Sequence, residues 1–366
     1  MTGTKQSDSL QALRALAFTG IFLLHASAGV EWAALGVSTF FVLSGFLLTR
    51  RHYEETYDLT PAACFSSAVK RVGSIYPLHL LTMLFAVALN IYVYILDGWT
   101  PARVCFLLGK IFFNVTLTQS WVPSTTINCS LNGVAWFLSV SLFLYFMFPY
   151  VVRRVRRFQT KRSLAVCCGS VLLVQIAACA VMVHVPPLID DSFFTWFSYC
   201  FPLFRLGDFV VGCCLGAWTL RDSCADKPAV WKYTAFEILA LLLTIAVYRW
   251  TGRGPSGTLW TVLKNNTTVY IPLAAVWVSL FFSRSGWITR VLTARPLIFI
   301  GNISAELFLI HYVVTRYTEQ AVNLLPSLAA EPARYCVIAG EYGLSVLLAL
   351  LYRRCRKRGK RPAARS

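Results

Sequence analysis

Ten long apolar stretches, separated by short polar and basic connections, run along this chain of 366 residues. A helix needs about 20 mostly apolar residues to cross the hydrocarbon core of a bilayer, and each stretch is close to that length or exceeds it. The pattern predicts an all-α, polytopic membrane protein with about ten transmembrane helices. We expect the spans at 10–29, 33–49, 74–96, 133–152, 163–185, 198–220, 233–250, 266–283, 296–317 and 334–352.

Lysine and arginine set the expected orientation, because these residues collect in the cytoplasmic loops. Basic runs follow the fourth span, at 153–162, and the tenth, at 353–366. Both runs lie on one side when the first span runs outward, so we expect both termini in the cytoplasm. The expected organisation is a single transmembrane domain, 1–352, and a basic cytoplasmic tail, 353–366. No repeat is evident that would support a transporter built from inverted halves.

Residues 98–132 are the ambiguous part of this layout, because 103–119 is apolar enough to suggest an eleventh span. An eleventh crossing would put the basic run 153–162 outside. We therefore expect an external loop at 98–132 with an interfacial or re-entrant helix. The beginning of the chain also has a second interpretation: Lys5, the apolar stretch 15–24 and the small residues 26–28 resemble a cleavable signal peptide.

Composition excludes two other classes of protein. Hydrophobic residues make up 57% of the chain and charged residues 14%, against about 45–50% and 25% in soluble domains. A disordered chain is poor in apolar residues, so disorder is excluded as well. The net charge of +18 is in itself typical of nucleic-acid binding. Here the basic residues form short runs between apolar stretches, so we expect a lipid bilayer and no nucleic acid as partner.

The twelve cysteines do not form the pattern of a disulfide framework, since several lie inside apolar stretches. Cys105 and Cys129 share the expected external loop, where a bridge between them stays open. No cysteine or histidine group has the spacing of a zinc site, so we expect no metal.

Arg14 and His25 are the most informative polar residues of the first span. Eleven residues bring the two side chains to within about 20° of each other on a helix, about 16 Å apart along its axis. Histidine is the side chain best suited to take up a proton near neutral pH. The alternative is that Arg14 reaches to the interface and His25 bonds a neighbouring helix. Spacing alone leaves both open.

Other polar groups lie inside the expected spans or in the loop that follows the second span. Ser44 and Gly45 allow either close helix packing or a hydroxyl beside a ligand. Arg205 and Asp208 are three residues apart in the sixth span and are expected to pair. In the ninth span, the carboxylate of Glu306 needs a cation or a proton. The basic residues after the second span, Arg50, Arg51, Lys70 and Arg71, suit either phosphate groups or lipid head groups.

Five motifs in this order resemble the acyltransferase family 3 of membrane proteins, over nearly the whole chain. They are Leu13–His25 with its arginine and histidine, Gly36–Phe46, Lys70-Arg71 with Ile75-Tyr76-Pro77, Gly133–Pro149 with Trp136, and Gly301–His311 with Ser304. The chain departs from the family at Ser141, where a glutamate is usual, at Ser74, where an arginine is usual, and at Ala305 and Phe308, where tyrosines are common. These changes bear on acceptor choice and donor contacts.

The resemblance implies a multi-pass enzyme of the cytoplasmic membrane that moves an acyl group, often acetyl, from cytoplasmic acyl-coenzyme A to a hydroxyl of a glycan or lipid-linked sugar. It implies His25 as the general base, with acyl-histidine as an alternative, and Arg14 as its catalytic partner. Arg50, Arg51, Lys70 and Arg71 would hold the anionic donor. Contacts with the acceptor are expected from Ser44, Trp136, Ser304, Glu306 and His311.

Two rival functions remain on the sequence alone. The same buried charges would form a substrate path in a transporter or flippase for an anionic glycolipid. Ser141 makes a non-catalytic member of a glycan-assembly complex a second rival. Consumption of a thioester by the purified protein separates the enzyme from a transporter. Normal glycan acylation in a strain that carries only a His25 variant would favour the non-catalytic member.

Overall fold

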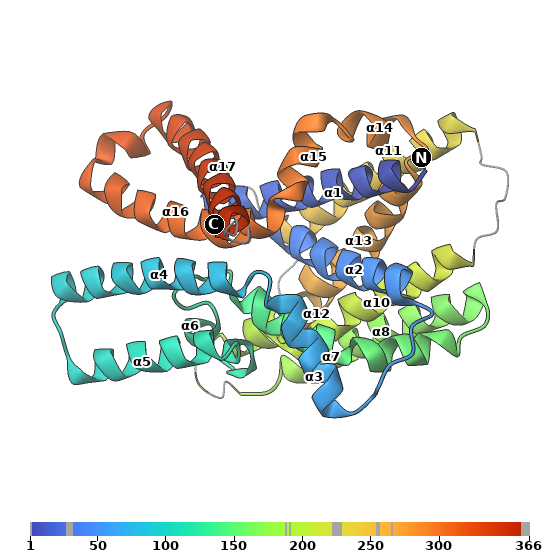
Figure 1. Ribbon diagram of the computed structural model, residues 1–366, viewed down its shortest axis with the longest axis horizontal. Coiled ribbons are helices and arrows are strands. Elements are labelled where there is room, and N and C mark those ends of the chain that lie inside the picture. Colours follow the sequence, from blue (N-terminus) through green and yellow to red (C-terminus); the bar gives the residue numbers. More distant parts are fainter. Residues whose placement is uncertain are drawn as a thin grey trace, which may run out of the picture.

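A computed structural model describes residues 2–26, 32–186, 189, 192–221, 229–253, 257–264 and 266–359. These residues form helices and no strand, which confirms the all-α prediction (Figure 1). The elements are α1 Thr2–His25, α2 Ala33–His52, α3 Pro61–Val72, α4 Tyr76–Asp97, α5 Pro101–Val115, η1 Gln119–Trp121, α6 Thr125–Asn128, α7 Trp136–Arg156, α8 Lys161–Met182, α9 Phe193–Thr195, η2 Trp196–Cys200, α10 Pro202–Leu220, α11 Val230–Arg253, α12 Thr258–Leu263, α13 Asn266–Ser283, α14 Trp287–Leu292, α15 Arg295–Asn302, α16 Ser304–Leu324, η3 Pro326–Ala329 and α17 Ala333–Gly359.

Eight helical segments in the described part of the chain are long and apolar enough to cross a membrane. They coincide with eight of the ten expected spans. The ninth expected span falls on α15 and α16, which are bent by 76° at the break between them. If this pair counts as one span, the described residues contain up to nine. The first expected span falls on α1, which carries Asp8 and Arg14 and is not among the eight. The multi-pass architecture is thus confirmed, while the orientation of the termini remains a prediction.

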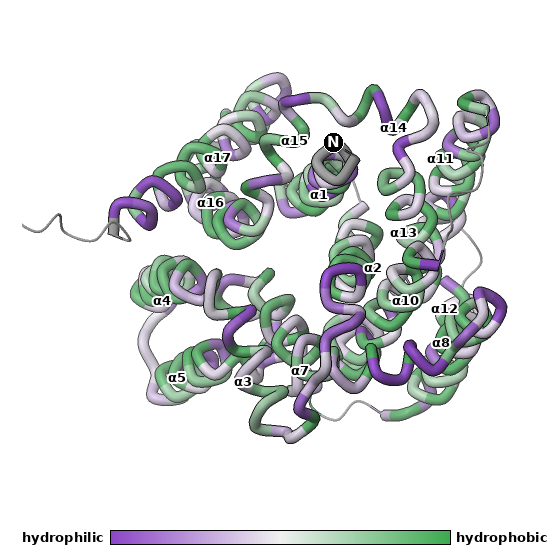
Figure 2. The backbone as a smooth tube through the Cα atoms, turned by 45° about the vertical axis from the view of Figure 1, so that its right-hand side comes forward, coloured by the Kyte–Doolittle hydropathy of each residue, from purple (hydrophilic) through white to green (hydrophobic). Residues whose placement is uncertain are grey.

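The helices pack as one bundle, which Figure 2 shows approximately end-on. Most of the length of each helix is apolar, and hydrophilic stretches concentrate at helix ends and connections. A large core of aromatic and aliphatic side chains, including Phe18, Phe22, Phe41 and Trp136, joins α1 and α2 to α7, α10 and α16. α1 and α2 therefore lie near the centre of the bundle.

α2 and α10 approach each other closely because both carry glycine at the contact. A Cβ atom on Gly212 would lie 2.0 Å from the Val42 carbonyl oxygen, and one on Gly45 would lie 2.2 Å from that of Phe209. Only glycine lets the two backbones come this near. The close-packing interpretation of Ser44 and Gly45 thus holds for the glycine.

The first part of the segment 98–132 forms a helical hairpin with α4, in which α5 runs back beside α4 (Figure 1). Gly98, with a φ of 90°, turns the chain after α4, and Thr100 caps α5 by accepting a hydrogen bond from the backbone nitrogen of Arg103. α5 then runs back along α4, so that the Tyr76 hydroxyl donates to the carbonyl of Val115 at 2.7 Å. α5 therefore packs antiparallel to α4, while the external position of this loop and the choice between an interfacial and a re-entrant helix stay predictions.

The connection between α5 and α7 carries several buried polar side chains. Gln119, Ser120, Asn128 and Asn132 are all buried. The Asn132 amide donates to Thr82 on α4 and to the carbonyl of Leu309 on α16, at 3.0 and 2.9 Å. These hydrogen bonds tie the connection between α5 and α7 to the helix that carries His311.

Three smaller expectations concern cysteines, an ion pair and the tail. Cys105 and Cys129 are both free thiols, as are the other cysteines of the described residues. Arg205 and Asp208 are fully buried with their nearest charged atoms 3.5 Å apart, so they do pair. α17 continues through Arg353 to Gly359, so the first part of the expected tail is helical; residues 360–366 lie outside the described part.

Candidate active site

Two histidines from opposite ends of the chain meet in the bundle. His25 is the last residue of α1, and His311 lies in the second turn of α16. The Nε2 atom of His311 is 3.3 Å from the Nδ1 atom of His25. His311 is fully buried. The structure therefore brings the sequence-predicted base together with one of the residues expected around it.

The hydrogen bonds around this pair determine where its protons lie. The Nδ1 atom of His311 is 3.0 Å from the carbonyl oxygen of Leu307. A carbonyl only accepts, so in the neutral ring Nδ1 of His311 carries the proton and Nε2 has a lone pair. That lone pair needs a donor, which is the N–H at Nδ1 of His25. The Nε2 atom of His25 is then unprotonated and is the basic atom of the pair.

Aromatic rings hold both imidazoles in place. Phe18 packs edge-on against His311 with centroids 5.4 Å apart, and Tyr312 packs edge-on against His25 at 5.1 Å. Rings packed against two faces restrict rotation of the imidazoles. Restriction of this kind keeps a base in the geometry that proton transfer requires.

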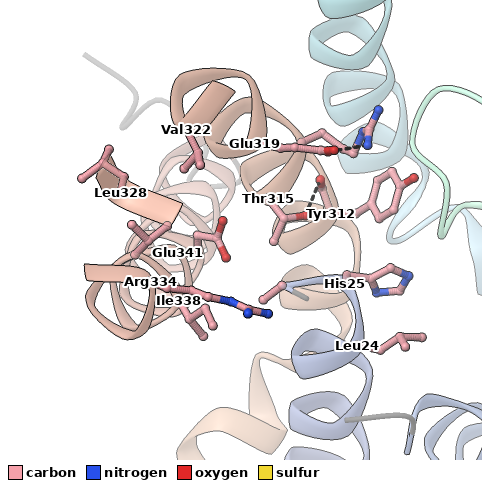
Figure 3. A pocket seen from close by; sticks show the side chains of 13 residues that line it. Leu24, His25, Tyr312, Thr315, Glu319, Val322, Leu328, Arg334, Ile338 and Glu341 are labelled. Atoms are coloured by element: carbon pink, nitrogen blue, oxygen red, sulfur yellow. Dashed lines mark hydrogen bonds and ion pairs between the residues drawn. The ribbon is translucent and has the colours of Figure 1, made fainter. Parts of the chain in front are cut away.

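His25 is one of the residues that line a cavity of about 500 Å³ between the end of α1, α16 and α17 (Figure 3). This volume is within the range of small-molecule sites. Figure 3 shows the carboxyl of Glu341 directed towards Thr315 and the guanidinium of Arg334 directed towards the end of α1, whereas the ring of His25 points away from both. Tyr312, Thr315, Arg316 and Glu319 supply further polar lining from α16.

Sequence reasoning missed most of this lining, although a signal for it exists. Arg334, Ile338 and Glu341 are spaced i, i+4 and i+7, so they share one face of α17. Glu341 is a carboxylate inside the tenth expected span, and an ionisable residue at such a place indicates function. Glu306 was expected at the site because it is a carboxylate inside a span, and Glu341 has the same property.

Arg14 does not line the cavity at His25, although both residues lie on α1. It sits further towards the start of the helix, close enough to Tyr145 of α7 to interact electrostatically. Its Nε atom is buried and has no hydrogen-bond partner among the described residues. Arg14 and His25 thus border different parts of the bundle.

Ser304 and Glu306 have partners within the fold. The Ser304 hydroxyl donates to the carbonyl of Gly301 at 2.8 Å, across the break between α15 and α16. Arg353 of α17 donates from Nε and Nη2 to the two oxygens of Glu306, at 2.7 and 3.0 Å, and also bonds the Asn302 carbonyl. Neither Ser304 nor Glu306 lines the cavity at His25. Both stabilise the bend that presents α16.

Ser44 and Trp136 also lie away from that cavity. The Ser44 hydroxyl donates to the carbonyl of Phe40 on its own helix at 2.8 Å. Trp136 is buried, with its ring centroid 5.1 Å from that of Tyr199 and 6.3 Å from that of Phe41. These two contacts are those of core packing.

The expected donor-binding cations divide into two groups. Arg50 and Arg51 line a cavity of about 560 Å³ at the end of α2, together with Arg221. The Arg50 guanidinium stacks on Phe282 at 4.3 Å and donates to the Thr219 hydroxyl at 2.7 Å.

On α3, Lys70 is exposed and Arg71 is partly buried, and neither lines this cavity. The Arg71 guanidinium lies over Phe148 at 5.8 Å and interacts electrostatically with Glu55. The hydrogen bond from His52, 2.5 Å long, holds the pKa of the Glu55 carboxyl below its usual range. Glu55 therefore presents a negative charge to Arg71.

Among the described residues, no group of three or more histidine, cysteine, aspartate or glutamate side chains is arranged to hold a metal ion. The chemistry available at the cavity is that of an imidazole base, two guanidinium groups and two carboxyl groups.

Comparison with known proteins gives a consistent set of relatives. The family described as "Acyltransferase domain" matches residues 7–351. The acyltransferase MdmB of Streptomyces mycarofaciens is 28% identical over 306 residues, which cover 81% of this chain and 71% of that protein. The O-acetyltransferase OatA of Staphylococcus aureus is 24% identical over 335 residues, 86% of this chain and 51% of that protein, so the chain spans about half the length of OatA. No solved structure matches.

Proposed function

Because the chain belongs to this acyltransferase family and is an enzyme that transfers acyl groups, we propose that it acylates a hydroxyl of a carbohydrate or lipid-linked sugar. The donor is acyl-coenzyme A, with acetyl as the first acyl group to test, and the enzyme resides in the cytoplasmic membrane. The observation that carries the proposal is the 3.3 Å contact of His25 with His311 beside a polar cavity.

In this proposal, Nε2 of His25 takes the proton of the acceptor hydroxyl as its oxygen attacks the thioester carbonyl. The tetrahedral intermediate then breaks its carbon–sulfur bond, and the departing thiolate takes the proton from His25. His311 keeps Nδ1 of His25 protonated and stabilises the imidazolium that forms between the two steps. General-base assistance of this kind contributes about 10²–10⁴-fold to the rate.

The donor is assigned to the side of the bundle that carries Arg14, Arg50 and Arg51. Coenzyme A is a polyanion, and arginine forms paired hydrogen bonds with phosphate groups. The buried Nε atom of Arg14 has no partner in the described structure, so an anionic or carbonyl group of the donor would satisfy it. A dry bundle around the thioester would also protect it from hydrolysis.

The acceptor is assigned to the cavity at His25. This cavity lies at the connection between α16 and α17, whereas the basic residues Arg356, Lys357 and Arg358 lie at the opposite end of α17. If the basic end is cytoplasmic, as lysine and arginine in short loops indicate, the acceptor enters from the outer side. The two substrates then approach His25 from opposite sides of the membrane.

The test uses purified protein in lipid nanodiscs with acetyl-coenzyme A, and cells that express each variant. We expect the wild type to release free coenzyme A and to add an acyl mass to a cellular glycan or glycolipid, and we expect His25→Ala to do neither. His184→Ala, which removes an exposed histidine that lines neither the cavity at His25 nor the one at Arg51, is the matched control and should retain both activities.

Two outcomes would contradict the proposal. Equal acylation by folded His25→Ala and wild-type protein would remove His25 from the chemistry. Acylation in cells without consumption of acetyl-coenzyme A by the purified protein would point to another acyl donor. Mass spectrometry after rapid acid quench separates direct transfer from an acyl-histidine intermediate, which would appear as an added acyl mass on the α1 peptide.

A further inference from the structure

Glu341 is a buried carboxylate with an unsatisfied oxygen at the cavity that His25 borders. Its residue is 7% exposed. The Thr318 hydroxyl lies within hydrogen-bonding reach of the carboxyl group, but the Oε2 atom has no hydrogen-bond partner in the described structure. A buried acceptor oxygen without a partner is costly to the fold. An oxygen kept in this state at a cavity is therefore a candidate contact for a bound ligand.

The other carboxyl group of the cavity is in a different situation. Glu319 forms an ion pair with Arg316, and about half of each side chain is exposed. This pair is locally neutral. Among the charged groups that line the cavity, Glu341 and Arg334 remain on α17, spaced by almost two helical turns on one face.

Figure 3 shows how these two side chains lie relative to the base. The Glu341 carboxyl points from α17 towards Thr315 of α16, and the Arg334 guanidinium points towards the end of α1, where His25 lies. One group accepts hydrogen bonds and the other donates them. A ligand with several hydroxyl groups can satisfy both, because a hydroxyl is a donor and an acceptor at once.

We propose that Glu341 and Arg334 form an acceptor subsite for a polyhydroxylated ring, in which Glu341 Oε2 accepts a hydrogen bond from one ring hydroxyl and Arg334 donates one to another. This inference rests on the proposed function, because it takes the hydroxyl-bearing acceptor from there. It adds the residues that select the acceptor. Glu341 is a binding residue and takes no part in proton transfer.

The acceptor used in the test is defined by the enzyme itself. The acylated species present in cells with wild-type protein and absent with His25→Ala is purified, and mild alkali removes its ester. The de-esterified compound is then titrated against wild type and variants in nanodiscs with saturating acetyl-coenzyme A. If no such species exists, the proposed function fails, and this is seen before Glu341 is tested.

We expect Glu341→Gln to raise the KM for this acceptor about tenfold or more, since hydrogen bonds to charged groups are worth more than neutral ones. Turnover at saturating acceptor and the KM for acetyl-coenzyme A should stay within about twofold of wild type, because binding energy that is equal in ground and transition states affects KM alone. Arg334→Gln should behave in the same way. Glu331→Gln, the same change at an exposed residue that does not line the cavity, is the matched control.

An unchanged acceptor KM in Glu341→Gln, with His25→Ala inactive, would overturn the subsite and leave the proposed function intact. A fall in turnover without a change in acceptor KM would also overturn it, since Glu341 would then act on the chemistry or the fold. Glu341→Asp provides a second measurement: it keeps the charge, and it should recover more of the acceptor affinity than Glu341→Ala.

Discussion

The Nδ1 atom of His25 and the Nε2 atom of His311 lie 3.3 Å apart, although 286 positions separate the residues in the chain. The Leu307 carbonyl at the far side of His311 fixes the direction of both hydrogen bonds. The contact therefore leaves one basic nitrogen in the pair, Nε2 of His25. In the proposed mechanism His311 is a positioning residue, since it acts through His25.

If His311 acts through His25, the two residues should not contribute independently. We expect His311→Phe, which keeps an aromatic ring but no hydrogen bond, to lower turnover at least about tenfold with little change in acceptor KM. The double variant with His25→Ala should be no slower than His25→Ala alone, because residues that act as a unit are not additive. His79→Phe, at a buried histidine elsewhere in the bundle, is the matched control. Additive losses in the double variant would contradict the pairing.

The ion pair of Glu306 with Arg353 should matter for stability rather than for chemistry. Glu306→Gln removes the charge that Arg353 contacts with two nitrogens. We expect a loss of roughly 1 kcal/mol in stability, limited because Arg353 is partly exposed to water. Thermal unfolding in nanodiscs measures this, and turnover of the folded protein should remain near wild type. A selective rise in acceptor KM would instead support a role in acceptor binding.

The contact between α2 and α10 should tolerate no side chain at Gly212. A Cβ atom there would lie 2.0 Å from the backbone oxygen of Val42, and a backbone atom in a packed core cannot move aside easily. We expect Gly212→Ala to cost about 1–3 kcal/mol, seen as a lower unfolding temperature and a lower yield of folded protein. Gly109→Ala, at a glycine with open space around it, should be harmless. Equal stability of both variants would refute the packing argument.

Arg50 and Arg51 line a cavity that Lys70 and Arg71 do not, so the two groups of basic residues can be tested separately for donor binding. Arg51 lines the cavity at the end of α2, and we expect Arg51→Gln to raise the KM for acetyl-coenzyme A about tenfold, as the loss of a charged hydrogen bond does. The effect should shrink at high salt, because the cavity is open to screening ions. Arg153→Gln, an exposed arginine outside that cavity, is the control. If Lys70→Gln raises this KM and Arg51→Gln does not, the donor binds along α3 instead.

The positions of the spans could be predicted well, and those of the site residues only in part. Long apolar stretches identify membrane helices because the bilayer requires each crossing helix to be apolar along its length, whatever it packs against. That requirement is local, so α2, α4 and α13 coincide closely with the expected ranges. α1 carries charged residues and is not among the eight apolar helices, and α15 and α16 reach the required length only as a bent pair.

Contacts between segments that are distant in the chain could not be predicted from a local sequence pattern. Ser304 and Glu306 were expected at the acceptor, yet Gly301 and Arg353 bind them within the fold. Glu341 was passed over, yet it borders the cavity with His25. The position of an ionisable residue in a span indicates that its charge needs a partner. It does not indicate whether that partner is a protein group or a ligand.

The sequence by itself determined the all-α membrane architecture, the family and the two histidines, since these depend on apolar length and on motifs read in order along the chain. Only the tertiary structure decided that His25 meets His311, that Arg14 lies elsewhere, and that α17 supplies Arg334 and Glu341 to the cavity. The physical reason is that a functional site depends on which faces of distant helices meet, and close packing of the whole bundle determines those faces.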